Sequence, residues 1–324
     1  MMQCLSPIYI DNPDFPRFTP IYEENTNLSN STLVKADEEC RKIAVPCGKC
    51  EACIHSSAQE WRIRIEEEFK VSRNALFFTL TYDDDSVPIV KSTSFDGEPV
   101  IVRSVSKRDV QLFLKRLRES FRKLDKNCKL RYYIVSEYGP RTLRPHYHGI
   151  LFNIPCYDPN RLITLKKTID TIYESWNRGF VSADKVIPER IGYVTKYLSC
   201  TANLPAEYNL PHTKPFRIMS QGLGRSYLEN PDVYLWHKDG LKTYTMNGRF
   251  KQVLPRYYKR KIFDQNELDE IRNRAIEHNH EKLIDAFIED LETYSRTGEF
   301  KSNEKIQKFK RNFNNKYVKK RKDI

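Results

Sequence analysis

Two histidines that lie two residues apart are the first feature of the sequence that could do chemistry. His146 and His148 fall in the segment RPHYHGILF, residues 144–152, which is rich in β-branched and aromatic residues. Successive side chains of a β-strand alternate between faces, so a strand would point both imidazoles to the same side. His278 and His280 have the same spacing in a predicted helix, where residues i and i+2 diverge. We therefore expect the strand pair to act together and the helix pair not to.

A carboxylate can join this histidine pair from the preceding predicted strand. Glu137 ends the strand at 130–138, and the loop PRTLRP leads back into the strand at 146–152. Antiparallel pairing would place Glu137 opposite His146, with His148 further along the same face. Two neutral imidazoles and one carboxylate form a three-ligand metal site that suits Fe(II), Zn or Mn at least as well as Mg. The alternative is a pair of half-buried histidines without a metal.

Two tyrosines and a lysine lie one helical turn apart further along the chain. Tyr193, Lys196 and Tyr197 stand at i, i+3 and i+4 of a helix predicted at 188–200, so they share a face. A tyrosine hydroxyl has a pKa of about 10 and is a poor nucleophile unless charge stabilises the group that it attacks. A divalent ion on a target phosphate would supply that charge, and Lys196 would screen the phosphate further. Packing in the core is the alternative interpretation of aromatic residues at this spacing.

A cysteine cluster precedes these motifs. Cys40, Cys47, Cys50 and Cys53 are separated by six, two and two residues, and the turn CGKC contains a glycine. Four thiolates can close a structural zinc site, with His55 as an alternative to Cys40. The spacing also resembles part of an iron–sulfur ligand run, although no fourth cysteine follows at the required interval. Unmodified thiols in a reducing cytoplasm are the third interpretation.

The charge of the chain favours a polyanionic partner. The 324 residues carry a formal net charge of +12, and the last 24 residues hold ten Lys or Arg against two Asp or Glu. We expect Lys319, Lys320 and Arg321 in this tail, and Arg144 beside the histidines, to contact nucleic acid. A solvated tail is the alternative. The sequence shows no apolar run of membrane-spanning length and no secretory signal, so we expect a cytoplasmic protein without a membrane partner.

The elements that position these residues follow from the hydrophobic pattern. The pattern predicts an extended arm at 1–35, the cysteine cluster with a helix at 36–70, a domain of strands and helices at 71–230, and a helical, basic region at 231–324. A helix beginning near Ser106 has Ser106 and Asp109 spaced as a capping box. Beyond about residue 205 the pattern is irregular until a long amphipathic helix. Interleaved strands and helices with a hairpin predict an α+β fold with a central antiparallel sheet.

Three segments in this order resemble the motifs of a known family. They are FFTLTYDDD at 77–85, SEYGPRTLRPHYHGILF at 136–152 and YVTKY at 193–197. The set is similar to the motifs of HUH rolling-circle replication initiators. With VPCGKCEAC upstream and VSKRDVQLFLKRLR between, it resembles more narrowly the replication initiators of gokushoviruses, small single-stranded DNA phages of the Microviridae. The resemblance covers roughly residues 40–225. Tyr147 stands where the family usually has an apolar residue, a departure that leaves the histidines intact.

The resemblance implies an RRM-like antiparallel sheet and a metal-dependent DNA endonuclease that forms a phosphotyrosine. His146, His148 and Glu137 would hold Mg²⁺ or Mn²⁺, Tyr193 and Tyr197 would be the nucleophiles, and Lys196 matches the lysine of the tyrosine motif. One tyrosine would nick the phage origin, and the freed 3′-OH would prime the host polymerase. The second tyrosine would allow the displaced strand to be rejoined into a circle. The implied partners are single-stranded and origin DNA and the host replication machinery, in the cytoplasm of a bacterial host.

Two other classes of function stay open from the sequence alone. Glu137, His146 and His148 also suit a non-haem iron oxygenase, although that class does not call for paired tyrosines, a lysine and a +12 charge. The cysteine cluster and the basic tail would suit a non-catalytic DNA-binding regulator with a zinc site. A covalent protein–DNA adduct would separate catalysis from both alternatives.

Overall fold

The computed structural model describes the chain in two compact units. The described residues are 4–11, 42–94, 96–139, 141–155, 157–196, 204–208, 210–298 and 301–317. The first unit spans Met1–Ser57 and the second spans Ala58–Ile324. In the first unit, β1 (Ile8–Asp11) pairs antiparallel with β2 (Lys42–Val45), and helix α2 (Glu51–Val71) begins. β1 thus lies within the segment that the sequence analysis expected to be an extended arm.

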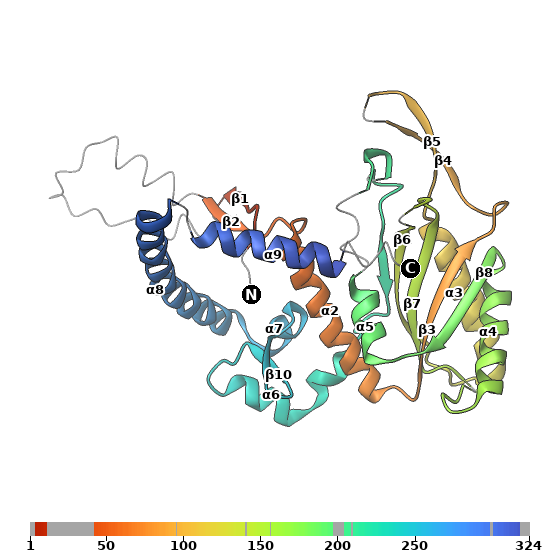
Figure 1. Cartoon of the computed structure of the whole chain (residues 1–324). Coiled ribbons are helices and arrows are strands. Elements are labelled where there is room, and N and C mark those ends of the chain that lie inside the picture. Colours follow the sequence, from red (N-terminus) through yellow and green to blue (C-terminus); the bar gives the residue numbers. More distant parts are fainter. Residues whose placement is uncertain are drawn as a thin grey trace. The chain divides into compact units, whose positions relative to one another are not determined.

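The second unit contains the remaining elements, which Figure 1 labels. Its first part runs through β3 (Ala75–Tyr82), β4 (Ile89–Thr93), β5 (Pro99–Arg103), α3 (Lys107–Leu124), β6 (Arg131–Tyr138), β7 (Pro145–Phe152), α4 (Leu162–Trp176), β8 (Gly179–Lys185) and α5 (Pro188–Lys196). Its second part runs through η3 (Ala206–Tyr208), β9 (Arg217–Met219), η4 (Arg225–Glu229), α6 (Pro231–Lys238), β10 (Tyr244–Asn247), β11 (Phe250–Val253), α7 (Arg256–Ile262), α8 (Gln265–Thr297) and α9 (Lys301–Tyr317). Within the described ranges, no helix combines the length and hydropathy that crossing a bilayer requires.

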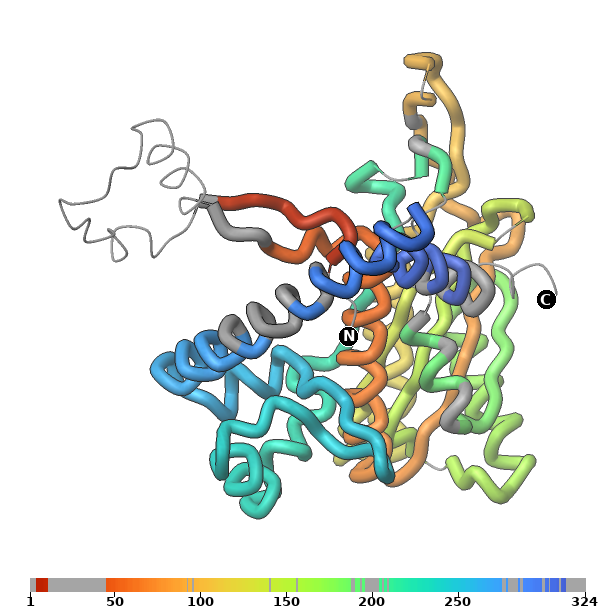
Figure 2. The backbone as a smooth tube through the Cα atoms, turned by 60° about the vertical axis from the view of Figure 1, so that its left-hand side comes forward, coloured from red at the N-terminus to blue at the C-terminus, as the bar shows by residue number. Residues whose placement is uncertain are grey.

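A five-stranded sheet organises the second unit. Its strand order is β8-β3-β7-β6-β9, and each neighbouring pair is antiparallel. The succession β3-α3-β6-β7-α4-β8 is a βαββαβ unit, and β9 extends it at the free edge of β6. The expected α+β fold with a central antiparallel, RRM-like sheet is confirmed. A separate hairpin, β4–β5, is inserted after β3 and extends away from the end of the sheet (Figures 1 and 2).

The two faces of the sheet bury different side chains, because successive residues of a strand alternate. On one face Phe78 and Leu80 of β3 pack against α3 and α4. On the other face Ala75 and Phe77 pack with side chains of α2 and α5. Figure 1 shows α4 and α5 on opposite sides of the sheet. We call the second side the histidine face, because it carries Thr79, Thr81, Glu137, His146 and His148.

Helix α3 begins as the sequence predicted, with one difference. Its N-cap is Ser106, whose hydroxyl accepts a hydrogen bond from the backbone N–H of Asp109. The carboxylate of Asp109, which a capping box would use at the helix start, instead accepts a hydrogen bond from the Tyr82 hydroxyl at 2.9 Å. The helix start is therefore tied to the end of β3.

The expectation that the chain is irregular beyond residue 205 is wrong. This stretch contains strand β9, hairpin β10–β11 and helices α6 and α7. β9 has three residues and becomes a strand through pairing with β6, which local sequence periodicity does not reveal. Tyr258 and Ile262 of α7 are buried with Ile63 of α2 in a further apolar cluster. The short elements are thus held by tertiary contacts.

Candidate active site

The sheet brings the predicted histidine pair and carboxylate to one face. Glu137 lies directly opposite His146 in the β6–β7 register, and His148 lies opposite Val135. The Nε2 atom of His148 is 3.2 Å from Oε2 of Glu137, and these side chains are only 13% and 7% exposed. The rings of His146 and His148 are 6.3 Å apart between centroids. The predicted strand register, with both imidazoles on one face, is confirmed.

Two threonines of β3 orient the histidines. Thr79 and Thr81 pair with His148 and His146 in the β3–β7 register, and their hydroxyls lie 2.9 and 3.0 Å from the Nδ1 atoms. A hydroxyl that accepts from protonated Nδ1 leaves the Nε2 lone pair for an ion, which is the usual way a metal-binding imidazole is held. Sequence analysis did not single out these residues. The signal was present, since Thr-x-Thr in FFTLTY has the period of His-x-His.

The electrostatics keep His146 in the form that binds metals. Burial lowers the pKa of His146 below its usual value, the neighbouring His148 lowers it further, and Glu137 opposes both effects. A lowered pKa favours the neutral imidazole at neutral pH, which is the ligand form. Within the described residues, only four cysteines form a group of at least three ligand atoms that all lie within 4.8 Å of one another. His146 would therefore have to turn towards Glu137 and His148 to share an ion with them.

Tyr147, between the two histidines, anchors the strand from the opposite face. Its side chain is fully buried, and its hydroxyl lies 3.0 Å from that of Tyr82. It also accepts a 2.7 Å hydrogen bond from the backbone N–H of Ser106, the N-cap of α3. Burial raises the pKa of Tyr147 well above its usual range, so it is a neutral structural group. This tyrosine links β7 to α3 while the histidines on either side point the other way.

Helix α5 packs on the histidine face. Its residues Ile191 and Val194 are buried in the cluster formed with the sheet. The guanidinium of Arg190 lies 5.5 Å from the ring centroid of Phe77 on β3. Phe77 in turn stacks on His148, with centroids 6.2 Å apart and planes at 15°. A continuous layer of side chains therefore connects the start of α5 to the histidine pair.

The predicted nucleophiles belong to the segment that follows. Tyr193 and Lys196 lie on α5, but their side chains fall outside the described part of the structure, as does the whole of Tyr197. Their roles remain predictions. Cys40 and the tail residues Lys319, Lys320 and Arg321 also lie outside the described ranges.

The arginines near the site have different surroundings. Arg144, a predicted DNA contact, donates to the carbonyl of Tyr82 at 2.7 Å and to Asp84 at 2.8 Å. These bonds lower the pKa of the Asp84 carboxyl and hold the loop after β3. Arg217 of β9 lies opposite Val135 in the register, on the histidine face, and its guanidinium stands 5.1 Å from the ring centroid of Trp61. Neither Arg190 nor Arg217 was singled out from the sequence, because each becomes part of this face through tertiary packing.

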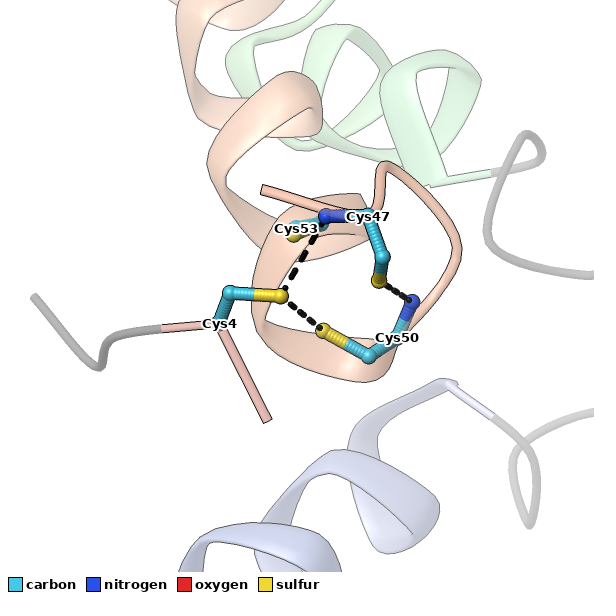
Figure 3. Close-up of side chains that lie close together, drawn as sticks. All are labelled: Cys4, Cys47, Cys50 and Cys53. Atoms are coloured by element: carbon cyan, nitrogen blue, oxygen red, sulfur yellow. Dashed lines mark hydrogen bonds between the residues drawn. The ribbon is translucent and has the colours of Figure 1, made fainter. Parts of the chain in front are cut away.

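The cysteine cluster belongs to the first unit and differs from the expected set in one residue. Cys4 joins Cys47, Cys50 and Cys53, and the four Sγ atoms all lie within 4.8 Å of one another (Figure 3). His55, the expected alternative ligand, is not a member of this group. Burial would raise the pKa of the Cys50 thiol, but hydrogen bonds from backbone N–H groups, including that of Leu5, lower it to about 6. Sequence spacing identified the three local cysteines, whereas nothing in it indicated the distant Cys4.

Comparisons with known proteins agree on one family. A family model described as replication-associated protein ORF2 matches residues 75–202, from the start of β3 to beyond α5. The replication-associated protein ORF2 of Spiroplasma virus 4 is 26% identical over 295 residues, or 87% of each chain. The replication-associated protein VP4 of Bdellovibrio phage phiMH2K is 31% identical over 171 residues, or 50% of each chain. That of Chlamydia phage 1, ORF4, is 24% identical over 271 residues, 76% of this chain and 63% of the relative.

No solved structure matches the chain. The matched segment 75–202 nevertheless contains β3, β6, β7, β8 and α5, the elements that build the histidine face. The resemblance that the sequence motifs indicated is thus confirmed, and the chain is similar to the replication-associated proteins of these phages over its sheet and most of its length.

Proposed function

We propose that this protein initiates rolling-circle replication by nicking one strand of a phage origin through a 5′-phosphotyrosine, and later rejoins the displaced strand into a circle. The catalytic domain would run from 71 to 230. The segments 1–35, 36–70 and 231–324 would serve as an arm, a cysteine-bound helix and a basic DNA-binding region. The protein would act in the cytoplasm of its bacterial host, where host replication enzymes extend the freed 3′-OH.

His146, His148 and Glu137 would hold a divalent ion. Two nitrogen donors and one carboxylate fit Mn²⁺ readily and can also take Mg²⁺, which keeps its remaining positions for water and phosphate oxygens. The threonine hydroxyls at Nδ1 would fix the direction of each imidazole. Such an ion polarises a phosphoryl oxygen and offsets the charge that develops during transfer.

Tyr193 or Tyr197 would attack the scissile phosphate. The bond between tyrosine oxygen and phosphorus forms as the bond from phosphorus to the 3′ oxygen breaks, and the proton of the phenol is exchanged for one on the leaving 3′ oxygen. Lys196 would screen the phosphate. The second tyrosine would cleave the regenerated junction while the first remains occupied. The waiting 3′-OH would then displace the first tyrosine, so joining needs no nucleotide cofactor.

DNA would be held mainly through its phosphates. Arg190 and Arg217 lie on the histidine face and carry charge that a bound strand can use. Arg144 and the tail residues Lys319, Lys320 and Arg321 are further proposed contacts. Binding of this kind depends strongly on salt and little on sequence.

One observation carries the proposal: the layer Arg190–Phe77–His148 joins α5, the helix on which Tyr193 lies, to the predicted metal ligands. A tyrosine helix and a metal-binding pair on one sheet face are what phosphoryl transfer to tyrosine requires. The family match supports a role in phage replication.

The direct test uses single-stranded oligonucleotides that tile the genome carrying this gene. Each would be incubated with the full chain and Mn²⁺, and the products run on a denaturing gel. We expect a covalent protein–DNA adduct with one oligonucleotide, which disappears on chelation and returns when Mn²⁺ is restored. DNA binding without any adduct across the whole tiling set would instead favour a non-catalytic DNA-binding role.

A further inference from the structure

We propose that Cys4, Cys47, Cys50 and Cys53 bind one zinc ion, which fastens the N-terminal segment to the start of helix α2. The ligand set replaces the distant Cys40 of the sequence prediction by Cys4, and it lies wholly within the first unit. The site is independent of the nicking chemistry.

The separation of the sulfur atoms fits a tetrahedral ion. With Zn–S bonds of about 2.3 Å, two sulfurs of a tetrahedral site stand about 3.8 Å apart. The Sγ atoms of Cys4 and Cys50 are 3.7 Å apart, and all four sulfurs fall within 4.8 Å of one another. A disulfide would need a sulfur–sulfur distance of about 2.05 Å, and the four residues are free cysteines. The arrangement matches four ligands around one centre better than two covalent pairs.

The local backbone is built to hold thiolates. The N–H groups of Lys49 and Cys50 point at Sγ of Cys47, at 3.4 and 3.3 Å, and the N–H of Cys47 points at Sγ of Cys4 at 3.3 Å. Figure 3 shows two of these contacts around the turn. Hydrogen bonds from N–H donors stabilise negative sulfur, which is the form that binds zinc. Gly48, within the turn, has φ of +72°, a conformation that glycine adopts without strain.

The helix start supplies a further favourable field. α2 begins at Glu51, so Cys50 precedes its first residue and Cys53 lies on its first turn. The unpaired N–H groups and the dipole at a helix N-terminus favour negative charge. Three of the ligands therefore come from one compact turn and helix start, and the fourth comes from the N-terminal segment.

The consequence is a clamp between parts of the chain that are far apart in sequence. Cys4 is followed by β1, which pairs with β2 just before the cysteine turn. A pairing of two four-residue strands is weak by itself. Zinc bound by both Cys4 and the turn would make the folding of this unit depend on the metal, because binding energy at a structural site is folding energy.

The experiment begins with the full chain as purified under reducing conditions. Elemental analysis should find one zinc per chain and no stoichiometric iron. After replacement of zinc by Co²⁺, the visible spectrum should show the intense absorption of a tetrahedral tetrathiolate site. A chain that binds neither metal at micromolar concentration, or that carries iron in place of zinc, would overturn the proposal.

Single substitutions identify the fourth ligand. Cys4→Ser should weaken zinc binding by more than about 100-fold in competition with a chromogenic chelator, because a primary ligand is lost. The matched controls Cys40→Ser and Cys128→Ser should bind zinc like the wild type. Loss of zinc in Cys40→Ser with retention in Cys4→Ser would show that Cys4 is not the ligand.

A second variant guards against simple unfolding. Cys4→His retains a ligand, so it should still bind Co²⁺, with a spectrum shifted from that of four sulfurs to that of three sulfurs and one nitrogen. An unshifted four-sulfur spectrum in Cys4→His would overturn the assignment of Cys4. Circular dichroism of the zinc-loaded variants would report whether each remains folded.

Discussion

The histidine face and the cysteine cluster are both sets of metal-type ligands, but the chain assembles them by different means. His146, His148 and Glu137 are fixed by the pairing of long central strands joined by a short loop. The cysteine cluster combines one local turn with Cys4, which is separated from it by more than forty residues of sequence. The first set also keeps its ligands less tightly gathered than the second. This contrast fits a catalytic site that exchanges its ion and a structural site that keeps it.

The largest effect should follow from removing the histidines. Replacing both His146 and His148 by Ala should lower adduct formation by at least about 1000-fold, because no imidazole remains to hold the ion. Binding of the origin oligonucleotide, which rests on phosphate contacts, should change by less than about threefold. Rates of adduct formation and a binding titration at one salt concentration measure both quantities.

Tyr147→Phe is the matched control, since it lies between the same two histidines on the opposite face. Loss of its hydroxyl removes partners from Tyr82 and from the N–H of Ser106 and should cost about 1–3 kcal/mol of unfolding free energy. Below its melting temperature the variant should still form the adduct. Full activity in the double alanine variant would end the metal assignment.

Chelation should separate the two sets of ligands. A mild chelator should abolish adduct formation within minutes, and added Mn²⁺ should restore it, while zinc stays bound to the cysteines. The two quantities to follow are adduct yield and zinc content of the same sample. If activity returned only when zinc was added back, the roles assigned to the two sites would be wrong.

A smaller effect is expected from the threonines beneath the histidines. Thr79→Val and Thr81→Val keep the branched shape but remove the hydroxyls that contact Nδ1. Each should lower Mn²⁺ affinity or activity by about 10–100-fold, the usual cost of losing such a partner. Measuring adduct rate against Mn²⁺ concentration should show a loss that high Mn²⁺ partly rescues. A loss independent of Mn²⁺ would point to damage elsewhere.

The smallest effect should come from the tail. Deleting residues 301–324 should weaken DNA binding without sequence preference and flatten its dependence on salt. Lys301 and Lys305 pair with Glu289, so they should contribute less than the remaining basic residues. Binding measured between about 50 and 200 mM salt, concentrations over which such contacts respond strongly, gives the slope. An unchanged slope would show that the tail does not contact DNA.

The sheet and the facing of its ligands could be predicted because they depend on local rules. Period-two alternation set the faces of β3 and β7, and the short loop before Pro145 fixed the register of Glu137 against His146. β9 and Cys4 could not be predicted, because a three-residue strand and a distant ligand exist only through contacts with residues far along the chain. Arg190 was missed for the same reason, since its value lies in the ring of Phe77 beneath it.

The most direct test of the proposed chemistry is to find the residue that carries the DNA. The adduct would be digested with nuclease and trypsin, and the peptides examined by tandem mass spectrometry. Cleavage after Arg190 and Lys196 places Tyr193 in the peptide 191–196 and Tyr197 at the start of the next one, so the two nucleophiles are read separately. We expect a nucleotide remnant on Tyr193 or Tyr197 and none when both are replaced by Phe. A remnant on any other residue, or an adduct that persists in the double Phe variant, would contradict the proposed nucleophiles.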